Sequence, residues 1–298
     1  MGSDDLSKDE IYKVFGLAER LDSNKERLAL SENSTVGLYF TEPSTRTRVS
    51  FEAAVAQLGG TPIYIDSKST QVSRGEALSD TARMLSMYCD MIAVRTVEHS
   101  DLLEIAHSSR VPVINALTKL EHPTQALADV YTIIKEKGRI DGLRIAFVGD
   151  ISQNTCNSLM ITATKLGANV SLVGPATFKP EPESYAKALS YNSRISITDS
   201  LEEGLHDADI IYTDTFVSMG DDAEREVRLR NLHNYQLNAG ALRFAPSSAR
   251  VMHPLPAHRG EEITGDVIDG DQSIVWKQAA NKLIIEKALI LFLEQSTE

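Results

Sequence analysis

The sequence lacks the features that mark secreted and membrane-spanning proteins. Only two of its 298 residues are cysteines. Cys89 and Cys156 lie in helical patterns without paired spacing, so we expect reduced packing residues of a cytoplasmic protein. No apolar run approaches the roughly 20 residues that span a bilayer. Residues 1–5 are polar and lack the apolar core of a secretory signal. We therefore expect no membrane contact.

Basic residues are also scarce. Lys and Arg number 30 against 42 Asp and Glu, which gives a formal net charge of −12. This balance argues against nucleic acid as a partner, so any strongly basic site must be a local exception. With 42% hydrophobic residues, the chain is long enough for two domains with cores of their own.

A glycine-rich cofactor fingerprint is missing as well. Residues 143–149 resemble the first strand of a nucleotide-binding unit, but G-x-G-x-x-G does not follow, since the chain continues from Gly149 to Asn154 as G-D-I-S-Q-N. A nicotinamide cofactor is therefore not expected. No cluster of Cys, His or carboxylates has ligand spacing, so we expect neither a metal nor an organic cofactor.

Short β-branched segments alternate with amphipathic ones along the chain. In the first half we expect strands at 35–40, 61–66, 90–95 and 112–117, and helical segments at 6–30, 45–58, 76–88, 99–108 and 123–137. In the second half we expect strands at 143–149, 169–173, 194–198, 208–213 and 249–253, and helices at 154–166, 182–190, 201–206, 224–237 and 280–294. This pattern predicts an α/β fold with two domains, each a mostly parallel sheet flanked by helices. A charged, glycine-bearing break at 136–142 places the domains at 1–138 and 139–279.

The densest set of anion-binding groups lies in residues 42–48, E-P-S-T-R-T-R. Ser44 to Thr47 should lie where a strand ends and a helix begins, so free backbone N–H groups and the positive end of the helix dipole are available. Three hydroxyls and two guanidinium groups are added to these donors, which together favour a phosphate or a similar dianion. The alternative is an ordinary helix capped by Ser44 with two solvated arginines.

Other polar residues follow expected strands. Arg95 ends a strand, and the carboxyl end of a parallel strand faces a ligand crevice; by itself it also fits a surface arginine. Residues 122–125, H-P-T-Q, begin a helix and also fit a simple cap with a polar first turn. Residues 67–76 read as a solvated loop, residues 213–220 (T-D-T-F-V-S-M-G) as a turn after a buried strand, and residues 253–257 (H-P-L-P-A) as a rigid proline loop.

Taken in order, these motifs resemble those of the aspartate and ornithine carbamoyltransferases over almost the whole chain. S-T-R-T-R and H-P-T-Q match motifs of the family, and D-T-F-V-S-M-G is similar to the D-x-x-x-S-M-G loop of the ornithine branch. The G-R-T pattern of the aspartate branch is absent after the Gly-Asp turn. The resemblance implies carbamoyl transfer from carbamoyl phosphate to the δ-amine of L-ornithine, which gives L-citrulline and phosphate.

The resemblance also implies roles for individual residues. The expected carbamoyl-phosphate ligands are Ser44, Thr45, Arg46, Thr47, Gln71, Arg95, His122, Gln125 and Lys282. Arg95, His122 and Arg46 are the expected catalytic residues. Arg95, His122 and Thr47 would polarise the carbamoyl carbonyl, and Arg46 would hold the phosphate. Arg48 would support the phosphate pocket, and Gln71 would reach the site of a neighbouring subunit in a homotrimer, or a multiple of trimers, with shared active sites.

The expected ornithine ligands are Asn154, Asp214, Ser218, Met219, Pro254 and Leu255. Asp214 would bind the α-ammonium, Asn154 the α-carboxylate, and the carbonyl before a cis Leu255–Pro256 bond would face the substrates. Two residues depart from the ornithine branch: Pro254 stands where that branch has Cys, and Lys282 where the family has Arg.

The resemblance further implies that the C-terminal helix, in residues 280–298, packs back on the first domain. Two alternatives remain open at this point. The acceptor could be another amine, such as aspartate, putrescine or an acylated ornithine. Alternatively, the chain could be a non-catalytic paralogue that binds phosphate-bearing metabolites.

Overall fold

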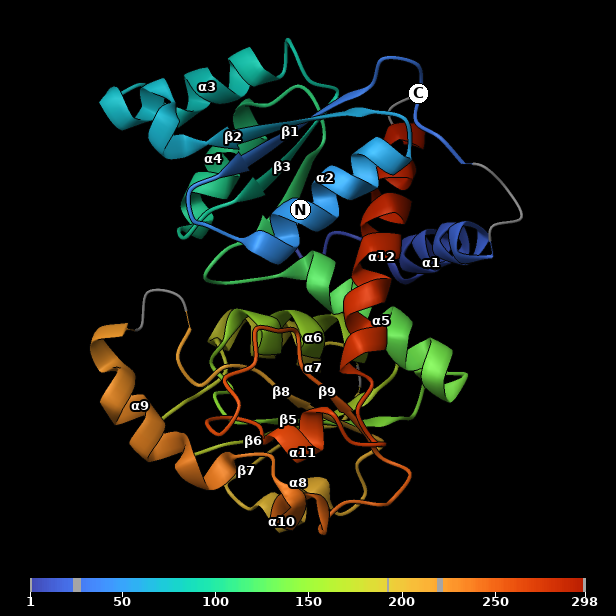
Figure 1. Cartoon of the computed structure of the whole chain (residues 1–298), viewed down its shortest axis with the longest axis vertical. Helices are drawn as coiled ribbons and strands as arrows, with labels where there is room; N and C mark the ends of the chain where they lie inside the picture. The colour runs from blue at the N-terminus through green and yellow to red at the C-terminus, as the bar shows by residue number, and fades with distance from the viewer. Residues whose placement is uncertain (1, 24–27, 192, 219–221, 297–298) are drawn as a thin grey trace. The chain divides into compact units, whose positions relative to one another are not determined.

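The computed structural model of the chain describes residues 2–23, 28–191, 193–218 and 222–296 (Figure 1). Its contacts divide the chain into two compact units. Unit 1 comprises Met1–Ala128 and Asn281–Glu298, and unit 2 comprises Asp129–Ala280. Helices α5 (Pro123–Lys137) and α12 (Val275–Gln295) each run through this division. The division within α5 lies ten residues before the boundary expected from the sequence, so the functional domain limits remain a prediction.

Unit 1 contains a four-stranded parallel sheet in the order β2-β1-β3-β4. Its strands are β1 (Thr35–Phe40), β2 (Thr61–Asp66), β3 (Met91–Arg95) and β4 (Val113–Leu117). Its complete helices are α1 (Lys8–Asp22), α2 (Thr45–Gln57), α3 (Leu78–Leu85) and α4 (His99–Ser108). The central strands are buried almost throughout because helices cover both faces of the sheet.

The strand order of unit 1 reverses direction between β1 and β3. Right-handed crossovers place α2 on one face of the sheet and α3 and α4 on the other (Figure 1). Under α3 and α4 lies a core that includes Tyr39, Leu85, Ile92 and Leu102. Ligands of parallel α/β sheets bind at such a reversal, beyond the carboxyl ends of the two strands.

Unit 2 contains a five-stranded parallel sheet in the order β7-β6-β5-β8-β9. Its strands are β5 (Arg144–Val148), β6 (Asn169–Val173), β7 (Ile195–Thr198), β8 (Ile210–Thr213) and β9 (Arg250–Met252). Its complete helices are α6 (Asn154–Lys165), α7 (Pro182–Leu189), α8 (Leu201–Leu205), α9 (Arg225–Leu232), α10 (Ala239–Leu242) and α11 (Gly265–Ile268). The reversal here lies between β5 and β8.

These two parallel sheets confirm the predicted fold class. The C-terminal part of α12 belongs to unit 1, as expected. There Lys282 contacts α2 and α5, and Glu294 accepts hydrogen bonds from Ser31 N (2.9 Å) and Ser34 Oγ (3.0 Å).

The expected helix 224–237 is shorter in the structure. α9 ends at Leu232 and gives way to a 3-10 turn, η4 (His233–Tyr235). Leu237 N donates to Glu262 O at 2.8 Å, and Leu237 O accepts from Thr264 N at 2.9 Å. This pairing with a distant segment draws the chain out of the helix, and local propensity cannot reveal it.

Three further local expectations differ from the structure. The lead-in helix ends at Asp22, well before residue 30. Cys89 follows α3 and lies outside any helix, although both cysteines are buried and free as predicted. The polar loop 67–76 folds into two 3-10 turns, η1 (Ser67–Ser69) and η2 (Gln71–Arg74). Hydroxyl groups stabilise these turns by donating to nearby carbonyls, as Thr70 Oγ1 does to Ser67 O at 2.7 Å.

Candidate active site

The carboxyl end of β1 leads directly into the S-T-R-T-R segment. Ser44 occupies the N-cap position of α2, yet its side chain makes no capping hydrogen bond. The alternative in which Ser44 merely caps the helix is therefore not supported. Thr45 and Arg46 are exposed in the first turn, whereas Thr47 is buried. The segment thus presents hydroxyls, a guanidinium and helix-start N–H groups from one turn.

Arg95 lies beside this segment because of strand register. It pairs with Phe40, the last residue of β1, and its carbonyl accepts a hydrogen bond from Thr41 N at 2.9 Å. Burial and the positive charge of Arg46 lower the pKa of Arg95 to about 10, against a smaller opposing effect of Glu42. Arg95 therefore remains protonated at neutral pH, and the repulsion indicates two cations that converge on one place.

His122 and Gln125 lie buried at the start of α5. Burial, followed by the charges of Lys282 and Arg95, lowers the pKa of His122 well below 6.5. The imidazole is therefore neutral at pH 7 and has one donor and one acceptor nitrogen. Lys282 Nζ donates to Gln125 Oε1 at 3.0 Å and to Thr47 Oγ1 at 3.4 Å. The structure thus brings Lys282 into the same cluster as H-P-T-Q and S-T-R-T-R.

Arg48 and Gln71, also expected near the phosphate, have different surroundings. Arg48 pairs with Glu52 at 2.9 Å, and its guanidinium lies 3.6 Å over the Tyr64 ring. These contacts hold Arg48 between α2 and β2, and its support of the phosphate pocket stays a prediction. Gln71 is exposed on η2, and its side chain makes no hydrogen bond with the described residues.

In unit 2, Asp214 follows β8 at the reversal of strand order. Its strand neighbour Thr213 pairs in register with Val148 at the end of β5. Asp214 Oδ2 accepts from Thr155 Oγ1 at 2.6 Å, and Oδ1 accepts from Thr215 N at 2.7 Å. Burial raises the pKa of Asp214, while His253 and these two hydrogen bonds oppose the rise. The carboxylate is held in one orientation and can accept a further cationic donor.

A buried ion pair anchors the loop after Asp214. Arg228 of α9 pairs with Asp150, and Arg228 Nε donates to Phe216 O at 3.1 Å. Arg228 is 8% exposed and Asp150 is 2% exposed. Arg228 could not be predicted as part of the site, because nothing in the sequence indicates that an arginine of a polar helix is buried against a carbonyl twelve residues earlier.

His253 organises the H-P-L-P loop after β9. Its backbone N donates to Gln278 Oε1 at 2.9 Å, its Nε2 lies 3.1 Å from Glu262 Oε1, and its Nδ1 accepts from Leu255 N at 2.9 Å. Leu255 has a left-handed backbone with φ of 59°, and the Leu255–Pro256 bond is cis as expected. The hydrogen bond from Leu255 to His253 stabilises a conformation that a branched residue rarely adopts.

The other expected ornithine ligands of unit 2 lie at the start of α6 and in the loops after β8 and β9. Asn154 is the first residue of α6, directly after the β5 turn. Ser218 ends the described part of the loop and is half-buried. Pro254 is also half-buried, beside Leu255. Met219 lies outside the described residues.

One group of potential metal ligands occurs in the described part of the chain. His258, Glu261 and Glu262 present ligand atoms within 4.8 Å of one another. Glu262 Oε1 already accepts from His253 Nε2 (3.1 Å) and His258 N (2.6 Å), and Glu261 pairs with Arg225. Through these bonds, the two glutamates support the H-P-L-P loop.

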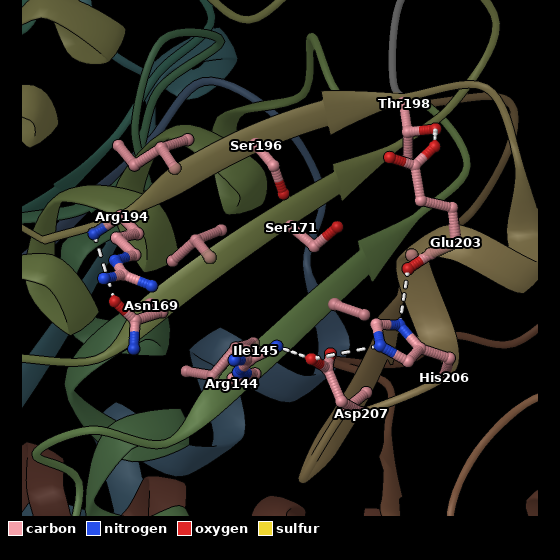
Figure 2. A pocket seen from close by; sticks show the side chains of 15 residues that line it. Arg144, Ile145, Asn169, Ser171, Arg194, Ser196, Thr198, Glu203, His206 and Asp207 are labelled. Carbon is pink, nitrogen blue, oxygen red and sulfur yellow. Dashed lines mark hydrogen bonds and ion pairs between the residues drawn. The ribbon is translucent and has the colours of Figure 1, made fainter.

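A pocket of about 320 Å³ opens on the face of the second sheet beside α8 (Figure 2). None of the expected site residues lines it. Its charged groups are largely satisfied among themselves, since Arg144 pairs with Asp207, and Glu203 accepts from Thr198 at 2.6 Å. It also lies along the strands of the sheet, whereas the reversal site lies beyond their carboxyl ends. It is therefore not the candidate active site.

Family profiles match both parts of the chain. Residues 1–135 match the profile described as "Aspartate/ornithine carbamoyltransferase, carbamoyl-P binding domain", and residues 141–293 match "Aspartate/ornithine carbamoyltransferase, Asp/Orn binding domain". The chain belongs to the aspartate/ornithine carbamoyltransferase family.

Its relatives include ornithine carbamoyltransferases from several organisms. The chain is 41% identical to that of Archaeoglobus fulgidus over 290 residues, which covers 96% of this chain and 94% of that protein. It is 42% identical to that of Bacillus thuringiensis subsp. konkukian over 299 residues, with 99% and 94% covered. Among solved structures, the ornithine carbamoyltransferase of Pyrococcus furiosus superposes with a TM-score of 0.93 at 39% identity, with 99% and 96% covered. The anabolic enzyme of Campylobacter jejuni superposes with a TM-score of 0.91 at 37% identity, with 98% and 97% covered.

Proposed function

We propose that this chain transfers the carbamoyl group of carbamoyl phosphate to the δ-amine of L-ornithine, giving L-citrulline and phosphate. The observation that carries the proposal is the register of β1 and β3, which brings Arg95 beside the S-T-R-T-R segment at the strand reversal of unit 1. The similar ornithine carbamoyltransferases match this chain over nearly its whole length, which supports the same reaction.

In this proposal unit 1 holds the carbamoyl donor. The phosphate is bound by the hydroxyls and N–H groups at the start of α2 and by the Arg46 guanidinium. Arg95 and neutral His122 donate to the carbamoyl oxygen, where negative charge develops as the amine attacks. Gln125 accepts from the carbamoyl NH₂, and Lys282, which contacts Gln125, adds positive charge beside the bound carbamoyl phosphate.

Unit 2 holds the acceptor. Asp214 binds the α-ammonium of ornithine, Asn154 and the start of α6 bind the α-carboxylate, and Ser218, Met219, Pro254 and the Leu255 carbonyl complete the contacts. The uncharged δ-amine forms a bond to the carbamoyl carbon, the bond from that carbon to the phosphate oxygen breaks, and the proton lost by the amine ends on the released phosphate. Positioning and fixed electrostatics supply most of the rate acceleration.

The chain also acts as a homotrimer, or a multiple of trimers, in the cytoplasm in this proposal. Gln71 supports the shared site, because its side chain is exposed and makes no hydrogen bond with the described residues of its own chain. The two buried free cysteines support the location, since thiols stay reduced in the cytosol. No helix in the described part of the chain is both long and apolar enough to cross a bilayer.

The test is citrulline formation by the purified chain from ornithine and carbamoyl phosphate, with phosphate release measured in parallel. Equal amounts of citrulline and phosphate are expected. Binding of carbamoyl phosphate without citrulline would identify a non-catalytic phosphometabolite-binding protein instead. Carbamoylation of another amine in place of ornithine would identify a different acceptor.

A further inference from the structure

Glu286 is a buried carboxyl group that the proposed reaction does not use. Its side chain on α12 is 0% exposed, and neither carboxyl oxygen accepts a hydrogen bond from the described residues. The Ser50 hydroxyl on α2 faces the same carboxyl, but it donates to Thr47 O at 3.2 Å. An ionised carboxylate without such partners is costly in a protein interior, so a group of this kind needs either a nearby cation or a proton.

The nearby cation is Lys282. It lies four residues earlier on the same helix, a spacing that places two side chains on one face. Lys282 is 8% exposed, and its Nζ contacts Gln125 and Thr47 of the proposed carbamoyl-phosphate site. The ammonium group thus contacts the proposed carbamoyl-phosphate site, and its charge also acts on the buried carboxyl of Glu286.

We propose that Glu286 is a positioning residue for Lys282 and takes up a proton when the phosphate-bearing substrate binds. In the free protein the carboxylate balances Lys282. When a dianion binds near the ammonium, the carboxylate becomes the surplus negative charge, and protonation removes the repulsion between the carboxylate and the dianion. The dianion thus replaces the Glu286 carboxylate as the negative charge that balances Lys282, and Lys282 stays fixed and charged in both states. This inference rests on the proposed function of unit 1.

The titration of Glu286 is consistent with such an exchange near neutral pH. Burial raises its pKa to about 7, against the opposing effect of Lys282 and a smaller effect of Ser50. Lys282 and Ser50 are the groups that act on this carboxyl. With that pKa, about half of the free protein carries an ionised Glu286 at pH 7. Dianion binding should therefore take up about half a proton at pH 7 and more at higher pH.

The experiment measures proton uptake on binding of phosphonoacetamide, in which CH₂ replaces the bridging oxygen of carbamoyl phosphate. Calorimetry in Tris and in PIPES at one pH gives the number of protons exchanged. The wild type is compared with Glu286→Gln, and Lys282→Arg with Lys282→Arg/Glu286→Gln. The second pair carries a guanidinium that cannot titrate, so it isolates the carboxyl. Glu294→Gln, on the same helix but hydrogen-bonded to Ser31, is the matched control.

At pH 7, proton uptake on binding should be lower by about half a proton in Glu286→Gln than in the wild type, and unchanged in Glu294→Gln. From pH 7 to pH 8 the affinity of the wild type should fall about fivefold relative to that of Glu286→Gln, because the ionised fraction to be neutralised grows. A merely structural role would change affinity without this dependence on pH.

Equal uptake in Lys282→Arg and Lys282→Arg/Glu286→Gln would overturn the inference alone, and citrulline formation by the wild type would still stand. Should a Lys282→Arg variant fail to fold, the comparison of wild type with Glu286→Gln decides by the same criterion. Failure of the wild type to bind phosphonoacetamide would overturn the proposed phosphate site and this inference together.

Discussion

Burial lowers the pKa of both His122 and Arg95, with different consequences for their charge. Arg95 has a pKa of about 10 and stays protonated at neutral pH, whereas His122 has a pKa well below 6.5 and is neutral. A neutral imidazole beside protonated guanidinium and ammonium groups can donate one hydrogen bond without adding a further charge. This division of roles suits a carbonyl that gains negative charge only during the reaction.

The pH dependence of the reaction should therefore follow the substrate amine. With saturating carbamoyl phosphate, log(kcat/KM) for ornithine should rise with a slope near one from pH 6 to pH 9, because an amine with pKa of about 10 must lose its proton before attack. His122 should cause no break near 6.5, since its lowered pKa keeps it neutral at and below that pH. A break near 6.5 that disappears in His122→Asn would contradict this account.

Asp214 should control the affinity for ornithine and leave that for carbamoyl phosphate unchanged. Asp214→Asn keeps one oxygen acceptor for Thr215 N, and its amide N–H can donate to the Thr155 hydroxyl, but the negative charge of the proposed α-ammonium site is lost. We expect kcat/KM for ornithine to fall about a hundredfold, or roughly 3 kcal/mol. Steady-state kinetics with each substrate varied will measure this, with Asp271→Asn, an exposed carboxylate of unit 2, as the control. An unchanged KM for ornithine would show that Asp214 is not its ligand.

At the level of elements, the loop after β8 is held in place by α9. Arg228 connects that helix to the Phe216 carbonyl and to Asp150, two residues after β5. One buried guanidinium thus joins the segment after β5 to the segment after β8. Because the ion pair is removed from water, losing one partner leaves an uncompensated buried charge.

Arg228→Ala should destabilise unit 2 by about 3–5 kcal/mol in urea unfolding. The matched control is Arg225→Ala on the same helix, whose ion pair with Glu261 is more exposed and should contribute at most about 1 kcal/mol. Asp150→Asn/Arg228→Met, which removes both charges, should recover part of the loss. Equal effects of Arg228→Ala and Arg225→Ala would show that burial of the pair does not matter.

The regular elements of the site could be predicted from the sequence, and its supporting contacts could not. The strand predicted at 35–40 is β1, and the helix predicted at 45–58 is α2 to within one residue, because apolar runs and helix-start residues are local signals. The burial of Arg228 and Glu286 depends on residues far away in the chain. The short helices α10 and α11 were missed for a similar reason, since the isolated pairing of Leu237 with Ile263 holds the segment that precedes α10.

At the scale of the whole molecule, the active site should depend on assembly. Gln71→Ala and Arg46→Ala should each be inactive alone, because each removes a group from every shared site. Mixing the two variants after dissociation and reassembly should restore part of the activity, since some hybrid trimers contain a site with both groups intact. Each variant reassembled with itself is the control. A monomer in solution, or no recovery on mixing, would refute the shared site.

The choice of acceptor tests the account most directly. In the proposed site, Asp214 binds one α-ammonium, and the N–H groups at the start of α6, near Asn154, bind one α-carboxylate. Aspartate would bring a second carboxylate into the site, and burying that charge without a partner costs several kcal/mol. Putrescine would leave the helix start unused.

The decisive measurement is kcat/KM for ornithine, lysine, putrescine, N-acetylornithine and aspartate, determined side by side with saturating carbamoyl phosphate. The account predicts the highest value for ornithine, with lysine lower because its chain is one methylene longer, and N-acetylornithine lower because its α-ammonium is blocked. A higher value for aspartate or putrescine than for ornithine would contradict it.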